Sequence, residues 1–188
     1  YFIDNEGYFG GFRPYGDDVL YEIEKYAFFS KAALSALPMI GFRPDLIHCH
    51  DWQTGLIPVY LKERFQGGDF YRGIKTVMTI HNLGYQGVYG EDSFPALGLD
   101  WNLYYGAGLE HNGAINLLQA GIACADMITT VSPTYAKEIQ EAEGGFGLDG
   151  LLRVRSDVVK GILNGCDLET WNPKTDKLIP YNFDYKSM

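Results

Sequence analysis

Two histidines and an aspartate fall within four consecutive positions of the segment HCHDWQTG, which covers residues 48–55. Alternate residues of a strand point to the same side and imidazoles bind zinc or iron, so His48 and His50 could begin a metal site. The only other histidines of the sequence are His81 and His111, and no second H-x-H or H-x-x-x-H pair supplies more ligands. With so few possible ligands, we expect no metal. Imidazole and carboxylate at this spacing suit hydrogen bonds to a polar ligand at least as well as they suit metal binding.

Polar residues follow four short apolar runs that have the character of strands. The runs cover residues 45–49, 74–80, 127–131 and 158–163, and they are followed in turn by His50-Asp51-Trp52, His81-Asn82, Ser132 and Asn164-Gly165. Helical patterns separate the runs, and nearly continuous apolar strands are typical of parallel sheets. The sequence thus predicts an α/β fold, a Rossmann-like parallel sheet with helices on both faces. Ligands bind beyond the carboxyl ends of such strands, so the four clusters predict a binding site at one edge.

The spacing of apolar residues also predicts the helices that connect these strands. A long helix should begin at Gly16-Asp17-Asp18 and end at Pro38 and Gly41. Further helices are expected over residues 55–65, 113–125 and 133–140, the last with proline in its first turn. A long Gly-rich loop should follow the strand that ends at residue 80.

Each polar residue at the predicted edge also has a purely structural interpretation. His48 lies within a strand, and a buried histidine that hydrogen bonds to the backbone is the simplest expectation for it. Asp51 could cap the helix that follows, and spacing alone does not decide between capping and chemistry. Ser132 before Pro133 has the pattern of a helix N-cap, and Asn164-Gly165 has the pattern of a turn.

The segment GFGLDG at residues 145–150 satisfies the pattern G-x-G-x-x-G. A dinucleotide-binding segment of this kind must follow a strand, whereas here it follows the helical pattern that ends near Glu143. We interpret the match as accidental. Tyrosines and phenylalanines in the predicted loops, such as Tyr8, Phe9, Tyr85 and Tyr89, could instead form a surface on which sugars stack.

Composition restricts the classes of protein to consider. With 188 residues, 46% of them hydrophobic, the chain has enough apolar material for one packed core. Its net charge of -9 opposes binding to a phosphate backbone, so nucleic acid is not an expected partner. Three cysteines without a C-x-x-C pair suit a reducing compartment, and no apolar run approaches the about 20 residues of a membrane helix. We expect a cytoplasmic protein; its oligomeric state stays open.

Five motifs carry a resemblance to a known family. They are, in chain order, HCHDWQTGLIPVYLK, TIHNLGYQGVYG, GLEHNGAINLLQAGIACADMITTVSPTYAKEIQ, GFGLDGLLR and ILNGCDLETWNP. In this order they resemble the N-terminal domain of bacterial glycogen synthases and plant starch synthases, and FIDNEGYFGG near the start fits the same family. The resemblance implies a retaining glycosyltransferase of the two-Rossmann-domain (GT-B) kind. Such an enzyme moves glucose from ADP-glucose to the non-reducing 4-hydroxyl of an α-1,4-glucan such as glycogen, with no cofactor.

The resemblance also implies roles for individual residues. It makes Asp51 and His81 catalytic, with His81 near the 6-hydroxyl of the transferred glucose, and it places Asn164 at the domain junction facing the donor. The residues that it implies in substrate binding are Trp52, Asn82, Tyr85, Gln86 and Asn164. A carboxylate such as Asp51 suits a cationic, oxocarbenium-like transition state.

The same resemblance predicts how the chain is divided. Residues 1–165 are expected to be part of the acceptor-side catalytic domain, and residues 166–188 the linker and entry to a nucleotide-binding domain. The Lys-Gly-Gly loop and the C-terminal domain of the family do not lie within the sequence, so we expect a fragment that is inactive alone. His111 stands where relatives often have an aromatic residue. The preference between ADP-glucose and UDP-glucose stays open.

Other functions are considered alongside this one. A glycoside hydrolase normally needs two carboxylates that flank the scissile bond, and the predicted edge offers Asp51 alone among strong candidates. A glucan phosphorylase would carry its pyridoxal lysine in a second domain. A glucan-binding module would instead present a row of exposed aromatic residues.

Overall fold

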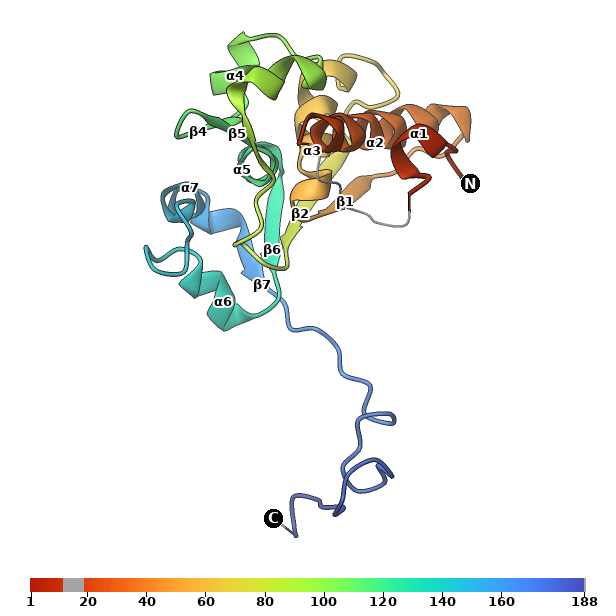
Figure 1. The fold of residues 1–188 in the computed structure, drawn as a ribbon, viewed down its shortest axis with the longest axis vertical. Helices are drawn as coiled ribbons and strands as arrows, with labels where there is room; N and C mark the ends of the chain where they lie inside the picture. The colour runs from red at the N-terminus through yellow and green to blue at the C-terminus, as the bar shows by residue number, and fades with distance from the viewer. Residues whose placement is uncertain (12–18, 188) are drawn as a thin grey trace.

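The computed structural model describes residues 1–11 and 19–187 and is built around a four-stranded parallel sheet (Figure 1). Its strand order is β1-β2-β6-β7. The strands are β1 (Leu46–His50), β2 (Lys75–Ile80), β6 (Met127–Thr130) and β7 (Val159–Gly161). All three neighbouring pairs are parallel, which confirms the predicted α/β fold and the four predicted strands. The last strand ends at Gly161, two residues earlier than expected.

The two faces of this sheet differ in burial. Cys49, Met78 and Ile128 lie side by side in the ladder and are fully buried. Met78 faces α5 (Leu117–Cys124), because a Cβ added to Gly121 in that helix would lie 2.6 Å from the Met78 methyl group. The residues at alternate positions point to the other face, where His48 is exposed and Val77 is half-buried. Among the described residues, the core therefore lies mainly on the Met78 face.

The helix α3 (Leu56–Tyr60) packs closely against α5 on this buried face. A Cβ added to Gly55 would lie 2.2 Å from the carbonyl oxygen of Leu117, so only glycine allows the approach. The predicted helix over residues 55–65 is confirmed in extent, but its second half, Leu61–Phe65, is a π-helical turn.

The long helix α2 (Val19–Met39) agrees with the predicted one, although Gly16-Asp17-Asp18 lie outside the described residues. Pro38 does not end it but occupies its last turn. Proline cannot donate to the carbonyl four residues earlier, that of Leu34. The hydroxyl of Tyr71 donates to this oxygen instead, at 3.0 Å, which explains how the helix tolerates Pro38.

Two predictions between β2 and β6 were only partly right. The expected helix over 113–125 is confirmed from Leu117 to Cys124, but Ala114–Asn116 before it form the strand β5. The expected Gly-rich loop after residue 80 also contains regular elements. These are β3 (Val88–Gly90), a 3-10 helix (Glu91–Leu97), α4 (Asn102–Gly106) and β4 (Glu110–His111). β3, β5 and β4 form a small antiparallel sheet. Asn116 accepts a hydrogen bond from the Gln119 amide and so starts α5 after the strand.

The remaining helices are short. They are α1 (Glu6–Phe9), α6 (Pro133–Glu138) and α7 (Asp149–Val154). The Ser132 hydroxyl accepts from the Tyr135 amide at 2.8 Å, which confirms the predicted N-cap of α6. Within the described residues, no helix combines the length and the apolar character needed to cross a bilayer.

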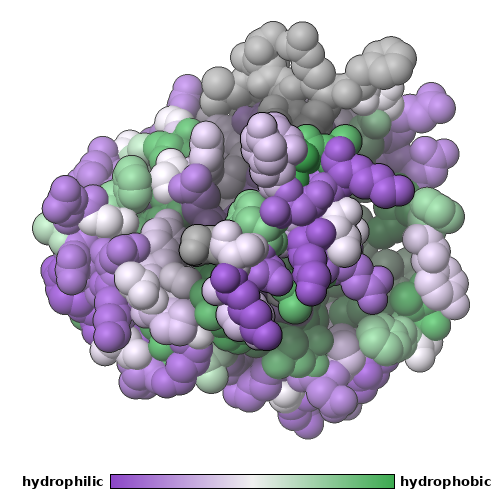
Figure 2. All heavy atoms as spheres, turned by 90° about the horizontal axis from the view of Figure 1, so that it is seen from below, coloured by the Kyte–Doolittle hydropathy of each residue, from purple (hydrophilic) through white to green (hydrophobic). Residues whose placement is uncertain are grey.

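Residues 162–187 form a tail without helix or strand. It leaves the carboxyl end of β7 and extends away from the rest of the molecule (Figure 1). Seen from this end, the surface is largely hydrophilic, with smaller hydrophobic areas between (Figure 2). Because the four strands are parallel, the tail departs from the same edge of the sheet at which β1 and β2 end.

Candidate active site

Asp51 occupies a strained turn directly after β1. Its backbone φ of 55° and ψ of -173° fall in a region that is nearly reserved for glycine, at a cost of about 1–3 kcal/mol. Its amide donates to the Thr79 carbonyl at 2.9 Å, and its carboxylate oxygen Oδ1 accepts from the His81 amide at 2.8 Å. The side chain makes no capping bond to the 3-10 helix Trp52–Thr54. Capping therefore does not account for an aspartate here, and the carboxylate ties the end of β1 to that of β2.

The ring of His81 is held by the ring of His50, the residue before Asp51. Nε2 of His81 lies 2.9 Å from Nδ1 of His50, and the planes of the two rings are inclined by 29°. Burial lowers the pKa of His50, and the charges of His48 and His81 lower it further, while Asp51 opposes them. The structure thus brings Asp51 and His81, the two predicted catalytic residues, into one cluster.

The sequence predicted a buried His48 that hydrogen bonds to the backbone, and both parts of this prediction were wrong. His48 is exposed, and its Nε2 lies 2.6 Å from the side-chain oxygen of Thr79 and not from a backbone group. Within the described residues, β1 is an edge strand, and His48 lies on the less covered face of the sheet beside the half-buried Val77. Thr79 in turn lies 2.6 Å from the Thr129 hydroxyl on β6, so a polar row crosses three strands.

Asn82 and Gln86 mainly organise the loop after β2. Asn82 is exposed, and its side-chain oxygen accepts from the Gly84 amide at 2.9 Å. Gln86 accepts from Asn116 at 2.6 Å and donates to the carbonyls of Leu83 and Phe146, each at 3.1 Å. The amide of Gln86 is thereby engaged with protein groups on three sides, so its side chain fixes the loop in place.

An open groove of about 520 Å³ lies beside this loop. It is lined by Glu22, Trp52, Gly84, Tyr85, Gln86, Gly87, Val88, Tyr89 and Phe146. The indole of Trp52 is only 8% exposed and meets the Tyr26 ring edge-on at a centroid distance of 4.8 Å. Gly87, at φ 62°, lies against the indole, and a Cβ there would be 2.4 Å from the ring.

The wall of the groove carries exposed aromatic and polar groups. Tyr85 is 69% exposed and Phe146 59% exposed, so both rings are open to a ligand. Glu22 accepts a hydrogen bond of 3.1 Å from the Tyr89 hydroxyl. Burial raises the pKa of Tyr89 and the charge of Glu22 raises it further, so this phenol stays protonated as a donor. Aromatic faces with a carboxylate at the rim suit a neutral, hydroxyl-rich ligand.

Phe146 and Glu22 are groove residues that the sequence reasoning missed. Phe146 has a positive φ of 46°, unusual for a bulky residue, and lies between Gly145 and Gly147 in the GFGLDG segment. That segment follows α6 and not a strand, as predicted. An aromatic residue between two glycines was the available signal. The imidazole of His111 lies under the same turn, since a Cβ on Gly147 would be 3.3 Å from its Nε2.

The structure does not bring Asn164 into the cluster formed by Asp51 and His81. It lies in the exposed tail, three residues beyond β7, and so leaves from the same edge as Asp51 and His81. Three strand spacings, about 14 Å, separate β7 from β1. Across residues 1–11 and 19–187, no three His, Cys, Asp or Glu side chains group in a way that could hold a metal ion.

The sequence matches the family model described as the starch synthase catalytic domain over residues 1–154. The chain belongs to this family. Glycogen synthase from Lachnospira eligens is 57% identical to this family member over 185 residues, and that from Lachnoclostridium phytofermentans is 53% identical. The alignments cover 98% and 97% of the chain but only 38% of either relative.

A solved structure of the family has the same fold. It is the catalytic domain of Starch Synthase IV from Arabidopsis thaliana bound to ADP and acarbose, with a TM-score of 0.76 and 35% sequence identity. The match covers 93% of this chain and 36% of that one. This member of the starch synthase family thus spans well under half the length of its relatives.

Proposed function

We propose that a protein containing this chain is a glycogen or starch synthase, acting in the cytoplasm without a cofactor. It transfers glucose from ADP-glucose to the non-reducing 4-hydroxyl of an α-1,4-glucan with retention of configuration. The observation that carries the proposal is the Asp51 carboxylate, which stands on a strained backbone, accepts from the His81 amide and lies next to Trp52 of the aromatic groove. The names of the relatives and the ligands of the Arabidopsis structure support it.

Each residue of the cluster has a role in this proposal. The charge of Asp51 stabilises the oxocarbenium-like transition state, and it fixes His81 through the backbone. The His81 imidazole meets the 6-hydroxyl of the transferred glucose. Asn82 contacts the same sugar, and Asn164 faces the donor from the junction between domains.

The groove takes the acceptor glucan. Trp52 forms its floor, and the exposed rings of Tyr85 and Phe146 stack against glucose units. Gln86 shapes this wall through its bonds to the Phe146 carbonyl and to Asn116. In this division, residues 1–165 belong to the acceptor-side domain and residues 166–188 lead to a nucleotide-binding domain.

A donor comparison tests the proposal against a phosphorylase or another glucan-active transferase. The full-length protein is incubated with maltoheptaose and with ADP-glucose, UDP-glucose or glucose 1-phosphate, and chain elongation is measured. We expect elongation from ADP-glucose and none from glucose 1-phosphate. Elongation from glucose 1-phosphate alone would overturn the proposal in favour of a phosphorylase.

The isolated 188-residue chain provides a second test. It should elongate no glucan and bind ADP-glucose weakly, because most nucleotide contacts are assigned to the other domain. Turnover by the purified chain would show that the donor site has been placed wrongly.

A further inference from the structure

We propose that His50 is a positioning residue, whose ring holds the ring of His81 in one orientation and one tautomer. The sugar that His81 then meets rests on the proposed function, but the positioning itself does not. His50 is the residue before Asp51, so two consecutive residues at the end of β1 hold His81. Asp51 fixes its backbone amide at 2.8 Å, and His50 fixes its ring at 2.9 Å.

The contact between the two rings requires one proton on the line between the nitrogens. In a neutral pair, one of Nδ1 of His50 and Nε2 of His81 carries the proton and the other accepts it. Two imidazolium rings cannot form this bond, because both nitrogens would then be donors. Once His50 adopts one tautomer, this bond sets whether Nε2 of His81 is protonated, and with it whether Nδ1 of His81 is a donor or an acceptor. Nδ1 is the nitrogen left to meet a substrate hydroxyl.

His50 is itself held well enough to orient a neighbour. Its amide donates to the Thr54 hydroxyl at 2.7 Å. Its ring lies on that of His48 with a centroid distance of 4.2 Å, and His48 is anchored to Thr79 at 2.6 Å. Among the described residues, the charged or titratable groups that act on His50 are His48, His81 and Asp51. The His50 ring is thus supported from its own strand and from β2, so it offers His81 a fixed hydrogen-bond partner. A water molecule in its place would allow the His81 ring to rotate.

Histidine NMR on the chain tests the positioning directly, because the sequence contains only four histidines. The ring ¹⁵N shifts distinguish the tautomers. In the wild type at neutral pH, His81 should show a single tautomer. His50→Phe keeps a ring over His48 but removes the nitrogens, so the His81 shifts should move to the averaged values of a free imidazole.

Two further variants distinguish positioning from a loss of packing. In His50→Asn, a side-chain oxygen or nitrogen stands near the former Nδ1, and the single tautomer should be largely restored. His48→Phe is the matched control on the same strand face: it keeps a ring against His50 but loses the bond to Thr79, so it should change the His81 tautomer much less than His50→Phe does. Averaged shifts already in the wild type, or equal effects of His48→Phe and His50→Phe, would overturn the proposal.

Kinetics of the full-length protein give a second readout. His50→Phe should lower kcat about 10-fold while KM for ADP-glucose changes less than about two-fold, because orientation is lost and not binding. In a His81→Ala background, the same change should have no further effect. Equal losses from His50→Phe in both backgrounds would overturn the proposal. A protein without any transfer from ADP-glucose would contradict the proposed function instead, and the NMR result would still decide the role of His50.

Discussion

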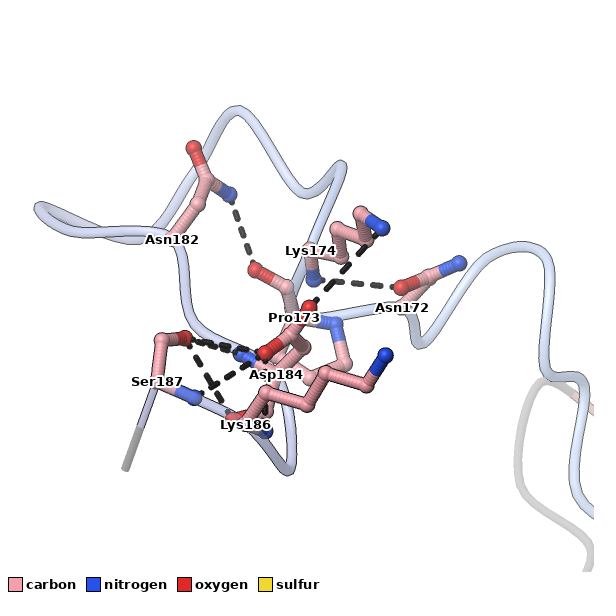
Figure 3. Close-up of polar contacts among 7 residues, drawn as sticks. All are labelled: Asn172, Pro173, Lys174, Asn182, Asp184, Lys186 and Ser187. Carbon is pink, nitrogen blue, oxygen red and sulfur yellow. Dashed lines mark hydrogen bonds and ion pairs between the residues drawn. The ribbon is translucent and has the colours of Figure 1, made fainter.

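The strand-end cluster and the C-terminal tail leave the same edge of the sheet but are built differently. One hydrogen bond joins Asp51 to His81, 30 residues apart in sequence, and each of the two follows a strand of the central sheet. In the tail, all the described hydrogen bonds after residue 166 join residues at most ten apart. Figure 3 shows an example around Asp184, which accepts from the amides of Lys186 and Ser187 at 2.9 and 3.1 Å. Sheet geometry alone thus assembles the cluster, whereas local turns do not place Asn164.

Burial shows the same contrast. Trp52 on the groove floor is 8% exposed, whereas Trp171 in the tail is 70% exposed. The ion pair between Lys174 and Asp184 is long, at 3.8 Å, and involves an exposed lysine, so it contributes little to stability. A conformation that is fixed by a core can thus preserve a strained site, whereas the described part of the tail has no core of its own.

The substitution Asp51→Asn should have the largest effect on function. Asn can still accept from the His81 amide and tolerates positive φ, so the melting temperature should hardly change. Loss of the charge should lower turnover of the full-length enzyme by about 10²-fold, or about 2.7 kcal/mol. Parallel measurement of kcat and thermal unfolding checks this. Near-normal turnover would mean that Asp51 only links the ends of β1 and β2 and that its charge does not contribute to catalysis.

Gly87→Ala should have the next largest effect, this time on stability. A Cβ at Gly87 would meet the Trp52 ring at 2.4 Å in a left-handed conformation, and we expect a cost of about 2 kcal/mol. Gly41→Ala is the matched control, because Gly41 has φ 66° and nothing within 4 Å of an added Cβ. Its cost should be nearer to about 1 kcal/mol, from backbone strain alone. Denaturant unfolding of both variants measures the difference, and equal costs would mean that Trp52 moves aside freely.

Phe146→Ala should weaken binding of the acceptor glucan alone. Loss of one stacking ring should raise KM for maltooligosaccharides about five-fold, or about 1 kcal/mol, with KM for ADP-glucose unchanged. Phe146→Tyr, which keeps an aromatic face, should behave almost like the wild type. Initial rates at varied acceptor concentration provide the check. An unchanged acceptor KM in Phe146→Ala would remove this residue from the glucan site.

Removal of residues 166–188 should have the smallest effect. These residues are mostly exposed, so the unfolding free energy of the remaining chain should change by less than about 0.5 kcal/mol. Thermal melts of the two chains decide the matter. A large drop would mean that the tail stabilises the sheet in a way that its exposure does not reveal.

The parallel sheet and the Asp51–His81 cluster were predictable from the sequence because apolar strands followed by polar residues are a local pattern. The antiparallel strand Ala114–Asn116 was not, since three residues of mixed character next to a helical pattern carry no clear period. The long Gly-rich loop was likewise misjudged because glycines there, such as Gly87 and Gly98 at positive φ, form turns between short elements.

The contacts of individual side chains were beyond sequence reasoning for a different reason. Gln86 fixes the loop through partners 30 and 60 residues away in sequence. The exposure of His48 depends on which strand lies at the edge of the described sheet. Phe146 reaches the groove from a segment 60 residues away in sequence from Gln86, and only the tertiary fold brings them together.

The burial of Trp52 has an optical consequence. The chain has three tryptophans, and the other two, Trp101 and Trp171, are 54% and 70% exposed. Indole emission depends on the polarity around the ring, so Trp52 should fluoresce at shorter wavelength than its two exposed counterparts. With Trp101 and Trp171 replaced by phenylalanine, the remaining emission would come from the groove floor alone. A change in this emission on addition of a maltooligosaccharide would report occupancy of the groove without turnover.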